Sequence, residues 1–78
     1  MESFEITASI NGKRVSLDAH YIGRYPDSNF DYFKIMHGNE TVSIIKVDGA
    51  CEIEVDSGEI DPEVFPSICD EIKRMKGG

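Results

Sequence analysis

Apolar and polar residues alternate along residues 3–10 and 13–21, with the period of two that is typical of β-strands with one buried face. The dipeptide Asn11-Gly12 separates the two runs and suits a two-residue hairpin loop, because both residue types tolerate positive φ angles. Pairing across this loop places Ala8 opposite Val15, Ile6 opposite Leu17, and Phe4 opposite Ala19. These residues are all apolar and share one face, so the pattern predicts an antiparallel hairpin with a buried side.

Three further β-like runs follow, at residues 30–37, 40–47 and 50–56. The dipeptides between them, Gly38-Asn39 and Asp48-Gly49, are also typical of two-residue loops. The registers that these loops predict agree with each other, since both place the same residues of the middle run on one face. The predicted pairs include Phe33 with Ile44 and Ile44 with Ile53. We therefore expect one apolar face made of Phe33, Ile35, Val42, Ile44, Ile53 and Val55.

The spacing of apolar residues changes to three and four after residue 56. Asp61-Pro62-Glu63 combines an N-cap residue, a proline suited to the first helical position, and an acid near the positive end of the helix dipole. The apolar stripe that follows is Val64, Phe65, Ile68, Ile72 and Met75. We predict a helix from about 62 to 76, packed on one face of a five-stranded antiparallel β-meander. This is an α+β fold in a single domain of residues 1–78, and a sheet curled into a partial barrel fits the same pattern.

The composition is that of a folded globular chain, because 40% of the 78 residues are apolar and 29% are charged. No apolar run approaches the roughly 18 residues that a membrane-spanning helix needs. The first residues lack the basic and then apolar pattern of a signal peptide. We therefore expect a cytoplasmic protein that does not insert into a membrane.

The net charge of −7 is concentrated in one segment, since residues 47–72 contain nine Asp or Glu residues and no Lys or Arg. Nucleic-acid binding depends on basic side chains that neutralise phosphates, so direct binding of DNA or RNA is disfavoured. We expect a protein partner instead, and a more specific version of this hypothesis is that the acidic segment binds a basic partner. The acidic segment would raise the rate of association with such a partner more than the affinity.

Residues that could carry out chemistry are few. Cys51 lies on the predicted apolar face and Cys69 flanks the helix stripe, so the two can meet as a disulfide or as two buried thiols. We favour two closely spaced, buried thiols between the sheet and the helix, reduced when the protein is made in the cytosol. His20 and His37 do not have the spacing to the cysteines that zinc sites require, and no strained Gly-x-Ser-x-Gly turn is present. An enzyme is therefore the less favoured class, and we expect neither a metal nor a cofactor.

The face opposite the predicted core carries more apolar residues than a solvated sheet face should: Phe30, Tyr32, Met36, Ile45 and Val47. Either the first hairpin folds over this face or the face is an open patch with an acidic rim. We expect Phe30 and Val47 to be covered and Tyr32 and Ile45 to be open. The predicted partner-binding residues are Tyr32, Ile45, Glu52 and Glu54.

The leading functional hypothesis is a non-catalytic protein-interaction module that uses this apolar face and its acidic rim. We expect a monomer or a weak homo-oligomer. The alternative is a small-ligand-binding or catalytic protein with a cleft near the irregular segment 22–29, which contains Arg24 and Tyr25 and lies close to His20.

Overall fold

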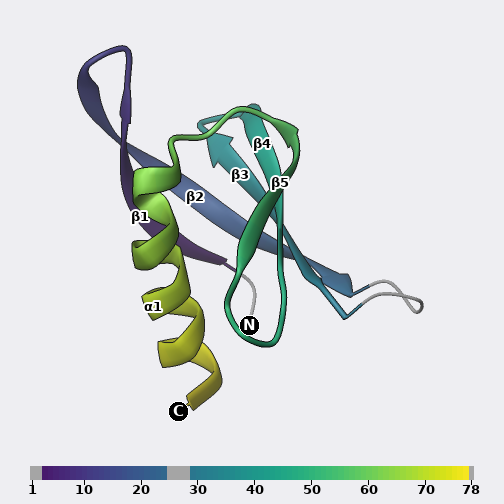
Figure 1. The fold of residues 1–78 in the computed structure, drawn as a ribbon. Coiled ribbons are helices and arrows are strands. Elements are labelled where there is room, and N and C mark those ends of the chain that lie inside the picture. The colour runs from purple at the N-terminus through teal and green to yellow at the C-terminus, as the bar shows by residue number, and fades with distance from the viewer. Residues whose placement is uncertain (1–2, 25–28, 78) are drawn as a thin grey trace.

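The computed structural model describes residues 3–24 and 29–77, which form one antiparallel sheet and a C-terminal helix (Figure 1). The strands are β1 (Ser3–Ile10), β2 (Lys13–Arg24), β3 (Asp31–His37), β4 (Glu40–Val47) and β5 (Ile53–Gly58), followed by the 3-10 helix η1 (Pro62–Val64) and the α-helix α1 (Phe65–Gly77). Strands adjacent in sequence are adjacent in the sheet, in the order β1-β2-β3-β4-β5. The predicted α+β meander is therefore confirmed, and its sheet is open, with β1 and β5 as the two edges.

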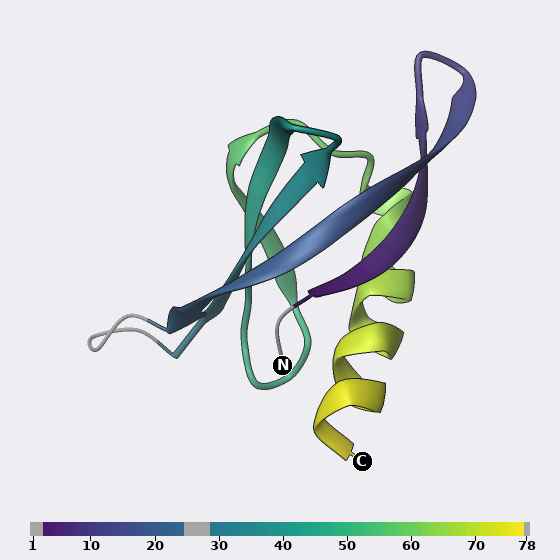
Figure 2. The ribbon, with the colours of Figure 1, turned by 180° about the vertical axis from the view of Figure 1, so that it is seen from behind.

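The sheet is strongly twisted and curves around α1, which lies between the two edge strands (Figures 1 and 2). The helix packs on the concave face of the sheet, where α1 and η1 both contact β1. Asp61 caps η1 by accepting a hydrogen bond of 3.0 Å from the main-chain N–H of Glu63, and Pro62 occupies the first helical position. Neither helical segment within the described residues is long and apolar enough to cross a membrane.

The first hairpin follows the predicted register, with Ile6 opposite Leu17. Asn11 and Gly12 both adopt positive φ angles, 52° and 79°, which is the conformation that a two-residue hairpin loop of this kind needs. β2 is longer than expected, because an irregularity after Tyr21 lets the strand continue to Arg24. The beginning of the predicted loop is therefore strand.

The register between β3 and β4 differs from the prediction. His37 pairs with Glu40 across the expected turn, but Val42 is then an extra residue that forms a β-bulge. Beyond the bulge Phe33 pairs with Ile45 instead of Ile44. Because side chains alternate between faces, this shift of one residue turns Ile45 toward the helix and Ile44 away from it.

The connection between β4 and β5 is also longer than predicted. Asp48 Oδ1 accepts hydrogen bonds from the main-chain N–H groups of Ala50 (2.8 Å) and Glu52 (2.9 Å), which orders a five-residue loop. β5 therefore begins at Ile53, which pairs with Val47, and the predicted pair of Ile44 with Ile53 is wrong.

The hydrophobic core lies between the concave face of the sheet and α1. The Phe33 ring is at its centre, with the rings of Phe4 and Tyr21 at centroid distances of 5.7 Å and 5.4 Å. The buried apolar residues are Phe4, Ile6, Ala8, Leu17, Ala19, Phe33, Ile35, Ile45, Val47, Val64, Ile68 and Ile72. Ser43 is buried among them, and its hydroxyl donates a hydrogen bond of 2.9 Å to the carbonyl oxygen of Ser57.

Cys51 and Cys69 form a disulfide that joins the β4–β5 loop to α1, with a Cα–Cα distance of 5.9 Å. Their predicted proximity is confirmed. The expectation of reduced, buried thiols is wrong for this structure, in which the bond forms and both residues are half-buried.

Candidate functional site

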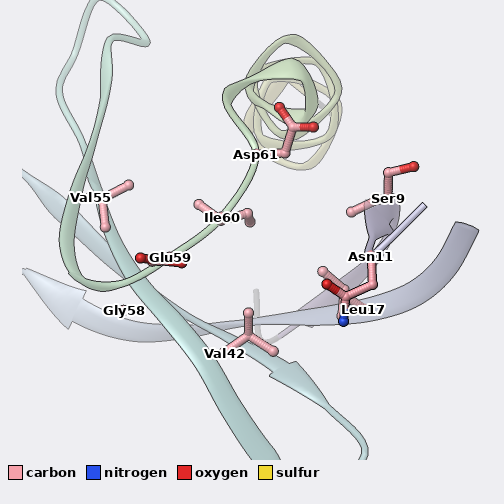
Figure 3. Close-up of a pocket in the computed structure, with 10 residues that line it drawn as sticks. Ser9, Asn11, Leu17, Val42, Val55, Gly58, Glu59, Ile60 and Asp61 are labelled. Carbon is pink, nitrogen blue, oxygen red and sulfur yellow. The ribbon is translucent and has the colours of Figure 1, made fainter. Parts of the chain in front are cut away.

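An open pocket of about 580 Å³ lies at one end of the core, next to the segment that connects β5 to η1 (Figure 3). We call it the mouth pocket. Its lining residues are Ala8, Ser9, Asn11, Leu17, Val42, Val55, Gly58, Glu59, Ile60 and Asp61. The pocket is thus built from the far end of the first hairpin, from β4 and β5, and from the connecting segment.

The interior of the mouth pocket is apolar. Leu17 forms part of its buried wall, and Val42 and Ile60 are half-buried beside it. Val55 is 41% exposed, although it occupies the strand position opposite the fully buried Ile45. In Figure 3 the side chains of Val42, Val55 and Ile60 border one shared space. This end of the core therefore exposes apolar surface to water.

Two β-bulges explain why Val42 and Val55 are not fully buried. Val42 is the extra residue in β4, and Asp56, which directly follows Val55, is the extra residue in β5. A bulge bends its strand and re-aims the neighbouring side chains. Because both irregularities lie at the same end of the β4–β5 pair, the sheet opens there and the pocket forms.

Gly58 lets the chain turn from β5 across the pocket. Its φ angle is +75°, and a Cβ atom at this position would collide with the carbonyl oxygen of Val42 and lie 2.9 Å from the Cα atom of Ser43. The next residue, Glu59, donates a main-chain hydrogen bond of 3.4 Å to the same Val42 oxygen. Only glycine satisfies both the conformation and the close approach.

The rim of the mouth pocket is acidic. Glu59 is exposed, and Asp61 is half-buried because its carboxylate also caps η1. Among the described residues that line this pocket, none is basic. Arg14 lines a smaller hollow next to it, together with Asp61 and Glu63. A positively charged group that approaches the mouth pocket therefore meets carboxylates first.

Both polar and apolar groups line the mouth pocket. It offers hydroxyl, amide and carboxylate groups around an apolar interior, but neither histidine nor cysteine. Within the part of the chain that the structure describes, no group of three His, Cys, Asp or Glu side chains is arranged to hold a metal ion.

The four predicted partner-binding residues do not form one surface. Ile45 is fully buried under the helix, so its expected exposure is wrong, and the cause is the bulge at Val42. Tyr32 is half-buried on the convex face, opposite Lys46. Glu54 lies on the other side of Lys46 and forms an ion pair with it at 3.4 Å, and Glu52 is exposed at the end of the β4–β5 loop.

Val47 and Phe30, which also belong to the predicted apolar patch, lie in different surroundings. Val47 is buried in the core, whereas Phe30 is half-buried beneath the Lys46 ammonium group, whose nitrogen lies 4.8 Å from the ring centroid. A hollow of about 690 Å³ next to Phe30 and Tyr32 is larger than the mouth pocket. Lys46 lines this hollow but is already bound to Glu54, so we consider the mouth pocket the better candidate.

Arg24, a residue of the predicted alternative site, has a structural role because it binds Asp31. The Arg24 guanidinium donates hydrogen bonds to both carboxylate oxygens of Asp31, from Nε at 3.2 Å and from a terminal nitrogen at 3.1 Å. The Tyr21 hydroxyl donates another, at 3.1 Å. The hydrogen bonds to Asp31, and then its negative charge, raise the pKa of Arg24. Arg24 thus compensates a nearly buried carboxylate, which would otherwise be costly.

The remaining residues of the alternative site do not contribute to a common cleft among the described residues. His20 is exposed on β2, opposite Lys34. Tyr25 lies outside the described residues. Neither His20 nor Arg24 lines the mouth pocket, the hollow beside Phe30 and Tyr32, or two smaller hollows in the described part of the chain.

The chain matches no family model, and neither a curated protein nor a solved structure is significantly similar to it.

Proposed function

We propose that the protein is a non-catalytic interaction module that binds a basic partner segment by taking an apolar side chain of that segment into the mouth pocket. One observation supports this most directly: the exposed Val55 side chain opens into an apolar pocket whose charged rim residues are both carboxylates. The leading hypothesis from sequence is thereby retained as a class of function, but with a different surface.

The apolar contribution comes mainly from the inserted side chain. Complete burial of a valine- or leucine-sized side chain is worth about 1.5–3 kcal/mol, and covering the exposed part of Val55 adds a smaller amount. A pocket that receives one such side chain matches the usual distribution of binding energy, in which a few buried anchors dominate.

The negative charges of the acidic segment determine that the partner is basic. Residues 47–72 carry nine acids and no Lys or Arg, and this segment includes Glu59 and Asp61 at the rim. Complementary charges raise the association rate and disfavour acidic competitors. Their effect on exposed groups decreases as salt screens it, so binding should weaken as ionic strength rises.

A short peptide that alternates arginine and valine can test this proposal. Its affinity would be measured by calorimetry for the wild type, for Val55→Asp and for Ile22→Asp. Ile22 is a matched control, because in the described part of the chain it is the second of two clearly exposed large apolar residues, at 47%, and it lies outside the mouth pocket. Both variants add one negative charge, so non-specific attraction of the peptide would increase equally.

We expect Val55→Asp to weaken binding about tenfold or more, since it places a charge in the apolar pocket, while Ile22→Asp binds as well as the wild type. Thermal unfolding of both variants shows whether they remain folded. Equal affinity of the two folded variants for the peptide would contradict the proposal.

A small apolar ligand is the second candidate, because the volume of about 580 Å³ lies within the ~300–1,000 Å³ typical of small-molecule sites. This ligand would bind in the mouth pocket and not near residues 22–29. Binding of a neutral ligand would be insensitive to salt, in contrast to binding of the basic peptide. Salt dependence therefore separates the two candidates.

A further inference from the structure

β5 is an edge strand whose second side pairs with no strand among the described residues. An edge of this kind presents main-chain N–H and C=O groups that can pair with another chain. All five residues from Glu54 to Gly58 are exposed. Both views of the fold show α1 diverging from β5 toward the end of the strand that borders the mouth pocket (Figures 1 and 2).

We propose, building on the proposed function, that the basic partner segment binds as an added β-strand along the free edge of β5. In this arrangement main-chain hydrogen bonds supply affinity, and alternate side chains of the segment supply specificity. The segment would place its apolar residue beside Val55 and thus into the mouth pocket.

The register within the sheet determines which side chains the segment needs. Val55 is opposite Ile45 and therefore on the concave face, whereas Glu54 is opposite Lys46 and on the convex face. A residue of the added strand next to Val55 would likewise point to the concave face, and its neighbour next to Glu54 would point to the convex face. A basic residue at the second position would share the Glu54 carboxylate with Lys46, which is possible because the Glu54 side chain is 64% exposed, and this cross-strand combination is favourable. The matching segment therefore alternates basic and apolar residues.

The charges on β5 also argue against a second copy of the chain as the added strand. Glu54 and Asp56 would bring like charges together across a β5–β5 pair, and the net charge of −7 adds long-range repulsion. Acidic side chains and bulges are devices that protect edge strands from such pairing. A basic strand avoids this repulsion. Because the bulge at Asp56 interrupts regular geometry, the pairing should be short and centred on Ile53–Val55.

A backbone N-methyl scan of the arginine–valine peptide tests strand addition. In an added strand only every second N–H of the peptide faces β5, so methylation should reduce affinity at alternate positions, by about fivefold to tenfold where a hydrogen bond is lost. Amide hydrogen exchange gives a second measurement on the intact protein. We expect amides of β5 to gain protection in the complex, whereas amides in the loop between β1 and β2 do not.

The outcomes distinguish the two proposals. Binding that depends on Val55 but shows no alternation along the peptide, with unchanged exchange in β5, would overturn strand addition and leave the mouth pocket as the binding site. Failure to detect any Val55-dependent binding would overturn both. A peptide in which glutamate replaces arginine should not bind, and binding of that peptide would contradict the charge selection proposed for the β5 edge.

Discussion

The main chain of Gly58 passes so close to the carbonyl oxygen of Val42 that a side chain at position 58 cannot be accommodated. This contact joins the end of β5 to the bulge in β4, and it allows the chain to cross the mouth pocket on its way to η1. The close approach therefore maintains both the fold and the proposed binding site.

Gly58→Ala should lower the free energy of unfolding by about 3 kcal/mol, because alanine disfavours φ of +75° and its methyl group collides with backbone atoms that cannot move independently. Urea denaturation measures the change. Gly38→Ala is the control for conformation alone, since Gly38 has φ of +63° but open space around it, and it should cost about 1 kcal/mol. Gly49→Ala, with neither constraint, should have little effect. Equal losses at Gly58 and Gly38 would argue against the steric part of the explanation.

Ile45→Ala should destabilise the protein by roughly 2–5 kcal/mol, because it leaves a cavity in a fully buried position. Ile44→Ala is the matched control on the opposite face of the same strand, where the side chain is half-buried, and it should cost about 1 kcal/mol or less. The two midpoints of chemical denaturation can be compared directly. A larger loss at Ile44 would show that β4 has the register without the bulge.

The sequence predicts the first hairpin well because Asn11-Gly12 specifies the loop and no irregularity follows in its strand pairs. The order of the strands and the position of the helix also follow from the turn signals and the change in periodicity. The bulges at Val42 and Asp56 could not be located in this way, because neither involves a glycine or proline. Each shifts the register by one residue, which is enough to exchange the two faces.

One signal for the first bulge was present in the sequence. If Ile44 pointed to the core, alternation would also place Lys46 there, whereas the observed register buries Ile45 and Val47 and leaves Lys46 on the convex face. The mouth pocket was missed for the same reason, since Val42 was expected to be ordinary core. The role of Gly58 depends on a contact distant in sequence, which local patterns do not reveal.

Loss of the Cys51–Cys69 disulfide should lower stability by about 3 kcal/mol, since the bond closes a loop between residues that are 18 apart and thereby restricts the unfolded chain. The measurement is urea denaturation with and without a reductant. The double variant Cys51→Ser/Cys69→Ser should resemble the reduced wild type and should not respond to the reductant. A wild type whose midpoint does not change on verified reduction would indicate that the bond contributes no net stability.

Substitution of the two rim carboxylates should affect stability differently, because Asp61 caps η1 whereas the Glu59 side chain does not. Asp61→Ala removes the cap of η1 and should cost about 1 kcal/mol of stability. Asp61→Asn retains an acceptor oxygen at the cap, so its stability should stay close to that of the wild type while one negative charge is lost.

The double variant Asp61→Asn/Glu59→Gln therefore removes the rim charge from a protein that remains folded. We expect its association with the arginine–valine peptide to be slower at low salt, with a smaller dependence of the rate on ionic strength, because electrostatic attraction acts mainly on the encounter step. Stopped-flow measurements at several salt concentrations provide these rates. Glu40→Gln serves as a control for the loss of one charge away from the rim, because Glu40 is exposed at the β3–β4 turn and does not line the mouth pocket. If neutralising Glu40 slowed association as much per charge as neutralising the rim, the attraction would come from the overall net charge, and the rim would have no special part in recognising the partner.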